Sequence, residues 1–90
     1  MEVIYIECKK MHSMDEFYDE LSKKLNFPEY FGKNLDALND ILDETEGDIL
    51  LTFYGYESFI RNVGEKAETA KEILIEKRDK KTNFRVMFES

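Results

Sequence analysis

The sequence has one cysteine, one histidine, one proline and no tryptophan. A single cysteine, Cys8, excludes a disulfide within the chain, and a lone thiol suits a reducing compartment. A zinc site of the usual kind needs clustered cysteines and histidines, which this chain lacks. His12 is the only histidine that could activate a nucleophile, and it stands just before a helix start. We interpret His12 as a surface or capping residue and Cys8 as a core or boundary residue.

Long apolar runs are also absent. No run reaches the ~20 residues of a membrane span, and residues 1–20 lack a secretory pattern. We therefore expect a cytoplasmic protein without membrane contact. Because 90 residues fit one domain, we expect residues 1–90 to form a single domain.

Basic residues are missing from one segment of the chain. Residues 34–60 contain no lysine or arginine, although the chain has 13 of them. The same segment contains seven acidic residues: Asp36, Asp40, Asp43, Glu44, Glu46, Asp48 and Glu57. Acids and bases balance elsewhere, so this segment carries the whole net charge of −7. Nucleic acid binds through lysine and arginine, so we expect a basic protein partner and no direct nucleic-acid contact.

The apolar pattern predicts an α/β fold. Apolar runs predict three strands, at 3–6, 49–54 and 83–88. We expect the first two to be covered on both faces, the second to be central and the third to lie at an edge. Helical spacing predicts helices at 14–25, from Asn34 to about 46, and at 65–80, and it allows a short helix at 56–63. Connections this long predict parallel strands, hence a small three-stranded parallel sheet with about four helices, in the order β-α-α-β-α-α-β.

Local signals predict where the first two helices begin and end. Ser13 and Glu16 form the pattern of a capping box at the start of the first helix. Asn34 is a good N-cap for the second helix, and Gly47 fits the C′ position after it. Gly32, in the loop between the two helices, is expected to adopt a backbone conformation that other residues resist.

The loop at residues 26–33 and the helix after it form the most distinctive stretch. Pro28 prevents a simple continuation of the first helix. The loop then either exposes both Tyr30 and Phe31 or tucks one of them in. In the following helix, the apolar positions cluster on one side and Asp36, Asp40 and Asp43 on the other. Like charges four residues apart cost a helix roughly 0.2–0.5 kcal/mol per pair, and nothing in the sequence obviously offsets this cost for Asp40 and Asp43.

Three interpretations of this acidic face can be compared. A solvated face and a protein interface both fit the residues, since exposed aromatics beside a row of carboxylates are typical of interface hot spots. A catalytic or metal-binding carboxylate cluster fits poorly. The spacing is not that of a calcium loop, and a flat helix face has no cleft to shift a pKa. We expect no catalytic residues, no metal and no cofactor.

Residues 28–40, Pro-Glu-Tyr-Phe-Gly-Lys-Asn-Leu-Asp-Ala-Leu-Asn-Asp, resemble the signature of the barstar family of intracellular ribonuclease inhibitors. The resemblance implies a barstar-like fold, whose second helix and preceding loop block the active site of a basic, secreted barnase-like ribonuclease. Carried over by motif, the partner-binding residues are Tyr30, Phe31, Gly32, Asn34, Asp36, Asn39 and Asp40. The loop after the helix would form the rim, with Glu44, Thr45 and Glu46. Asp43 and Glu44 add negative charge where small or neutral residues are common in the family, and we include both in the partner-binding surface. A further acidic contact late in the last helix falls at Glu76 or Lys77, and we assign it to Glu76.

The resemblance also implies a mechanism. The carboxylates of Asp36 and Asp40 would occupy phosphate positions in the enzyme. Separately, we expect the free protein to be a monomer. Asn39 and Thr45 stand where family members carry tryptophan, and Lys33 replaces an acid. A protein-interaction module that binds a different basic partner, with no ribonuclease target, is the alternative.

Overall fold

The computed structural model describes residues 1–89, which fold into three strands and four helices. The elements are β1 (Glu2–Glu7), α1 (Met14–Leu25), α2 (Leu35–Glu44), β2 (Ile49–Tyr54), α3 (Tyr56–Val63), α4 (Glu65–Lys80) and β3 (Phe84–Glu89). This order and the α/β class confirm the prediction, including the short helix at 56–63.

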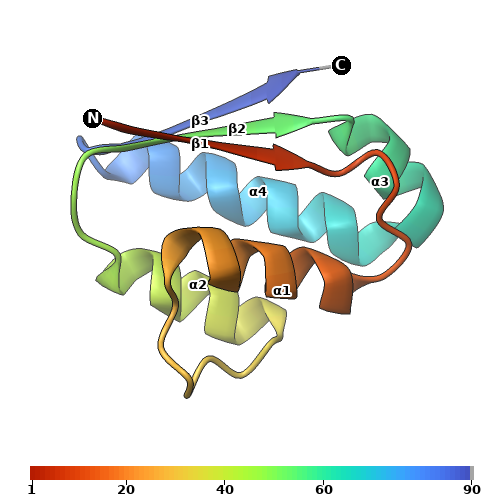
Figure 1. The fold of residues 1–90 in the computed structure, drawn as a ribbon, viewed down its shortest axis with the longest axis horizontal. Coiled ribbons are helices and arrows are strands. Elements are labelled where there is room, and N and C mark those ends of the chain that lie inside the picture. The colour runs from red at the N-terminus through yellow and green to blue at the C-terminus, as the bar shows by residue number, and fades with distance from the viewer. Residues whose placement is uncertain (90) are drawn as a thin grey trace.

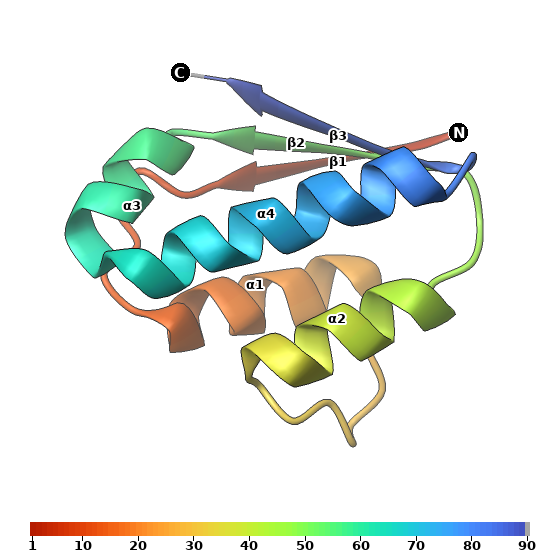
Figure 2. The ribbon, with the colours of Figure 1, turned by 180° about the vertical axis from the view of Figure 1, so that it is seen from behind.

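The three strands form one parallel sheet in the order β1-β2-β3. Ile49 of β2 is in register with Glu2 on one side and with Phe84 on the other. The central position of β2 and the edge position of β3 were both predicted correctly. All helices described lie on one side of the sheet or at its end, and α2 with the loop before it lies farthest from the strands (Figures 1 and 2).

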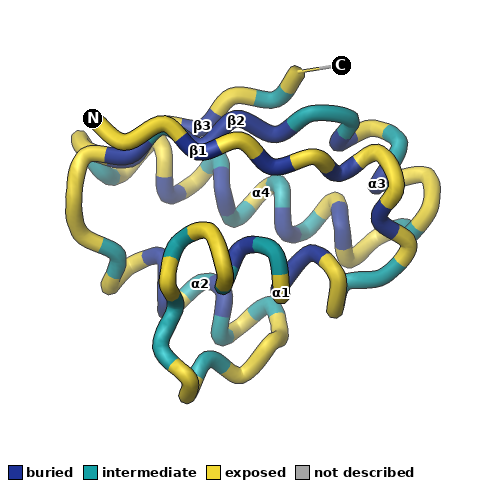
Figure 3. Tube along the Cα trace, in the orientation of Figure 1, coloured by how far each residue is buried: buried dark blue, intermediate teal, exposed yellow. Residues whose placement is uncertain are grey.

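The expectation that the first strand is covered on both faces is wrong. Ile4 and Ile6 are buried, whereas Val3 and Tyr5 are 42% and 56% exposed. Buried and exposed residues alternate along β1, as Figure 3 shows. Branched and aromatic side chains suit either face of a strand, so a run of them does not reveal that one face is open.

The second face of β2 is likewise not covered by a helix within residues 1–89 (Figure 1). Neighbouring strands shield it instead: Tyr5 of β1 stacks on Tyr54 with ring centroids 6.0 Å apart. Thr52 of β2, which is in register with Tyr5, is buried although it carries a hydroxyl group. No residue of β2 is exposed, so the predicted coverage of this strand on both faces holds, although the second face is shielded by neighbouring side chains and not by a helix.

An aromatic cluster joins the sheet to the helices. Phe17 of α1 stacks on Phe53 of β2 at 6.0 Å and on Phe59 of α3 at 5.0 Å. Tyr56 meets Phe53 edge-on, and its hydroxyl donates a 2.8 Å hydrogen bond to the carbonyl of Ala67 in α4. Buried tyrosines find such a partner because an unsatisfied hydroxyl is costly in a core. This cluster fixes the positions of α1 and α4, on which α2 depends.

The N-cap role of Ser13 at the start of α1 is confirmed, but the return bond of the predicted capping box goes to His12, one residue before the cap. The backbone N–H of Glu16 donates to the Ser13 hydroxyl at 3.2 Å. The Glu16 carboxylate in turn accepts from the N–H of His12 at 3.0 Å. Gly47, in contrast, is not at C′: α2 ends at Glu44 with Thr45 as C-cap, so Gly47 lies in the connection to β2.

The Cys8 thiol should be unreactive in the folded protein. Burial, reinforced by the carboxylates of Glu7 and Glu20, raises the pKa of this thiol to about 12. Because the thiolate is the reacting form, labelling by a disulfide reagent near pH 8 should be at least ~100-fold slower in native protein than in concentrated guanidinium. Equal rates in the two conditions would show that the thiol is accessible.

Candidate protein-binding site

Asn34 organises the start of the candidate site. Its side-chain oxygen accepts a 2.7 Å hydrogen bond from the N–H of Ala37, as predicted for an N-cap. Its side-chain nitrogen donates to the carbonyl of Gly32 at 3.4 Å. One side chain therefore ties the loop to the first turn of α2, and Asp36 in that turn lies near the positive end of the helix dipole.

The backbone bend in the loop is made by Lys33 rather than by Gly32. Lys33 has φ +50°, in the left-handed region, and Gly32 has no positive φ. A Cβ atom at Gly32 would make only ordinary contacts at 3.5 Å, so the conformational role predicted for this glycine is wrong. The Lys33 ammonium group lies 2.6 Å from the Asp19 carboxylate on α1, and this exposed ion pair accompanies the unusual backbone. The bend thus occurs one residue closer to the helix than the glycine indicated.

The two loop aromatics point in different directions. Tyr30 is 74% exposed. Phe31 is half-buried and packs edge-on against Tyr18 and Phe27, with ring centroids 5.8 and 5.0 Å away. Of the two alternatives predicted for this loop, the structure shows the one in which a single ring is tucked in. Phe31 anchors the loop to α1, which leaves Tyr30 available to a partner.

The two faces of α2 differ as predicted. Leu38, Ile41 and Leu42 are buried on the inner face. Three acids at positions i, i+4 and i+8 are exposed on α2 and form no ion pair within residues 1–89: Asp36, Asp40 and Glu44. We call these three residues the acid stripe. Glu46, just beyond the helix, is also exposed and outside the ion pairs of the described chain.

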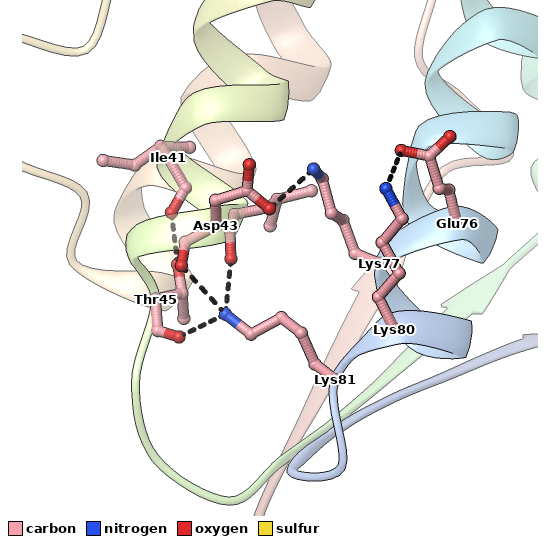
Figure 4. Close-up of polar contacts among 8 residues, drawn as sticks. Ile41, Asp43, Thr45, Glu76, Lys77, Lys80 and Lys81 are labelled. Carbon is pink, nitrogen blue, oxygen red and sulfur yellow. Dashed lines mark hydrogen bonds and ion pairs between the residues drawn. The ribbon is translucent and has the colours of Figure 1, made fainter.

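Asp43 differs from the acids of the stripe. Its carboxylate lies 2.6 Å from the Lys77 ammonium group of α4, drawn in Figure 4. This hydrogen bond holds the pKa of the Asp43 carboxyl below its ordinary value. The expectation that nothing in the chain offsets the repulsion at Asp43 is therefore wrong. Asp48 and Glu57 are paired as well, with Arg85 at 2.7 Å and with Lys71 at 3.4 Å.

Two hollows lie beside the acid stripe. The smaller, of about 200 Å³, is lined by Tyr30, Phe31, Gly32, Ala37, Asp40, Ile41 and Glu44. The larger, of about 340 Å³, lies between the loop and the end of α2, and its lining includes Tyr30, Glu44, Thr45 and Glu46. Tyr30 and Glu44 line both hollows. The fold therefore brings most of the sequence-predicted site residues to one continuous surface.

The remaining predicted residues line neither of these two hollows. Asn34 and Asp36 line a separate hollow with residues of α1, at the start of α2. Asn39 is half-buried on α2 and lines neither of the two hollows beside the stripe. Glu76 is exposed on α4 and pairs with Lys80 at 3.3 Å, whereas Lys77 is only 2% exposed. Of the two candidates late in α4, only Glu76 is thus accessible to a partner.

Sequence reasoning missed two lysines that hold the end of α2. Besides Lys77, the ammonium group of Lys81 donates to the backbone carbonyls of Leu42 at 2.8 Å, Asp43 at 3.2 Å and Thr45 at 2.7 Å (Figure 4). The one available signal was the lack of a basic residue in the last turn of α2, which left its carbonyls without a cation. That signal does not identify which distant lysine binds these carbonyls.

The surface beside the acid stripe is a candidate protein-binding site. No group of three or more potential metal-ligating side chains occurs in the described part of the chain. None of the helices in residues 1–89 is long and apolar enough to cross a membrane. The surface offers unpaired carboxylates, an exposed aromatic ring and two open hollows, which together suit a cationic, protruding partner.

Comparison with known proteins identifies the family. The model of the family described as Barstar (barnase inhibitor) matches residues 1–89. This chain belongs to the barstar family. It is also 30% identical, over 91 residues, to a Bacillus subtilis (strain 168) protein named "Putative ribonuclease inhibitor YrdF". That alignment covers 99% of this chain and 100% of the relative. The resemblance seen at residues 28–40 therefore extends over residues 1–89.

Replacing Asn34 by alanine should destabilise the free protein. The change removes the N-cap of α2 and should lower the free energy of unfolding by about 1 kcal/mol, measured by urea denaturation. Asn39→Ala is the matched control, because it makes the same change inside the same helix, where alanine is a good helix former. An equal loss in both variants would contradict the capping role.

Proposed function

We propose that this protein inhibits a barnase-like ribonuclease by inserting α2 and the preceding loop into the active site of the enzyme. Membership of the barstar family supports a ribonuclease as the target. The single observation that carries the proposed mechanism is a group of four exposed acids, close together in the chain, that form no ion pair within residues 1–89. Asp36, Asp40, Glu44 and Glu46 all belong to α2 or the two residues after it, and all are exposed.

The proposed mechanism is electrostatic mimicry of the substrate. A ribonuclease active site holds a phosphodiester and therefore presents cationic groups. Carboxylates of Asp36 and Asp40 occupy the places of phosphates and pair with those groups, with arginine in a bidentate arrangement where it is present. The enzyme is occluded competitively, and no covalent chemistry takes place. Opposite charge on the two surfaces also speeds their encounter.

The surrounding residues have distinct proposed roles. Tyr30 supplies the exposed aromatic contact, and Phe31 and Gly32 shape the smaller hollow beneath it. Thr45 and Glu46 form the rim on one side, and Glu76 of α4 adds an acid outside the hollows. Asn34 acts through the cap that fixes the loop against α2. A surface held in this way loses little freedom on binding, which favours affinity.

The proposal includes the cellular context. The inhibitor acts in the cytoplasm as a monomer and protects the cell that makes a basic, secreted ribonuclease. Asn39 and Thr45 occupy places where an aromatic anchor is common in the family, and this favours a second candidate: the same surface binds another basic protein. Mixing the protein with barnase and a panel of basic microbial ribonucleases, and following RNA cleavage, separates the two. Inhibition at an equimolar ratio supports the first candidate, and no inhibition of any panel member supports the second.

Asp40→Ala should weaken the complex without unfolding the inhibitor. Asp40 lies at the centre of the acid stripe, and loss of a hot-spot contact costs about 2 kcal/mol or more, roughly a 30-fold rise in Kd. The measurement is titration calorimetry against the inhibited ribonuclease. Glu72→Ala, on an exposed part of α4, changes the net charge equally and should leave Kd within about twofold of the original value. An unchanged Kd for Asp40→Ala would contradict the proposed role.

A further inference from the structure

The end of α4 grips the end of α2 through two lysines. The Lys77 side chain is only 3% exposed, and its ammonium group reaches the Asp43 carboxylate at 2.6 Å. Lys81, just after α4, donates to three backbone carbonyls at the end of α2 (Figure 4). We call Asp43, Lys77 and Lys81 the α2–α4 latch. Its contacts join residues 34 to 39 positions apart in the chain.

The Lys77 and Lys81 contacts of the latch each have a specific physical reason. A buried ammonium group is costly unless it is paired, and Asp43 is the ion-pair partner of Lys77 in the described chain. The last carbonyls of a helix lack intrahelical donors and carry partial negative charge. Lys81 supplies both the donors and the positive charge, and the Thr45 hydroxyl adds a 2.7 Å hydrogen bond to the carbonyl of Ile41. The end of α2 is therefore held from outside the helix.

The latch adjoins part of the proposed binding surface. Asp43 precedes Glu44, the last member of the acid stripe, and Lys81 bonds the carbonyl of Thr45 on the rim of the larger hollow. Any movement of the end of α2 therefore moves Glu44 and Thr45 relative to Tyr30. Glu44 and Tyr30 line both hollows, so their separation determines the shape offered to a partner.

We propose that the α2–α4 latch is a positioning device for the binding surface, and that Asp43 acts through Lys77 rather than by contacting the partner. This proposal rests on the proposed function, since it concerns how the inhibitor surface is held. It assigns different roles to two aspartates on one helix. Asp40 faces the partner, whereas Asp43 faces α4 and sets the position of the acids and rim beside it.

A double-mutant cycle separates positioning from direct contact. Asp43→Asn leaves Lys77 buried without a carboxylate, so the thermal midpoint should fall by about 5 °C and Kd for barnase should rise several-fold. In Asp43→Asn/Lys77→Met the buried charge is gone as well. The double variant should regain most of the stability and bind within about twofold of the original protein. If Asp43 touches the enzyme, the double variant will instead bind as weakly as Asp43→Asn, which would overturn the proposal.

Asp40 provides the matched control. Asp40→Asn should weaken binding without lowering the thermal midpoint, and adding Lys77→Met should give no recovery, because Lys77 is not the partner of Asp40. The salt dependence of the association rate gives a further readout. Asp43→Asn/Lys77→Met keeps the net charge of the chain and should keep this dependence, whereas Asp40→Asn should reduce it. If Lys77→Met restored the binding affinity of the Asp40→Asn variant, that would contradict a latch specific to Asp43.

The same variants distinguish failure of this inference from failure of the proposed function. If the unaltered protein does not bind barnase, ribonuclease inhibition is unsupported for that enzyme, but the unfolding experiments still test the latch in the free protein. Additive losses of stability from Asp43→Asn and Lys77→Met would overturn the latch whatever the protein binds. A recovery of stability in the double variant would support it.

Discussion

The constraint on which this structure depends is that a ten-residue acidic helix must be held in place from outside. A helix as short as α2 is marginal alone, and its like charges reduce its stability further. Burial of Leu38, Ile41 and Leu42 supplies most of the attachment. The Asn34 cap holds one end, and lysines from the end of α4 hold the other. With both ends fixed, the exposed face can carry unpaired carboxylates without fraying.

The acids of α2 fall into two groups, and the difference bears on the proposed function. Asp43 is satisfied inside the chain, whereas Asp36, Asp40 and Glu44 remain in water without an ion-pair partner in the described residues. Repulsion among the unpaired acids is a small, standing cost in the free protein. A cationic partner would relieve that cost on binding. A metal or a nucleophile is not needed for such a role, and the barstar family is one of inhibitors.

Local signals in the sequence predicted much of the fold and part of the local structure around the candidate site. The N-caps at Ser13 and Asn34 and the helical spacing of apolar residues involve neighbours within one or two turns, so they can be read without a structure. The parallel sheet followed from the length of its helical connections. The face occupied by Val3 and Tyr5 was not predictable in this way, because whether a helix covers a strand depends on how every other element packs. The bend at Lys33 was missed since glycine is only the commonest residue for that conformation.

The sequence by itself determined the location of the net charge, the two-faced pattern of α2 and the family signature at residues 28–40, because each of these is a property of nearby residues. Only the tertiary structure decided which carboxylates are free. Asp43 is paired because α4 brings Lys77 beside it from 34 positions away. Phe31 is half-buried because it packs against Tyr18 of α1 and against Phe27, whereas Tyr30 is exposed. Contacts between residues that are far apart in the sequence produce no periodic pattern in it. These contacts determine the shape and charge of the candidate binding surface.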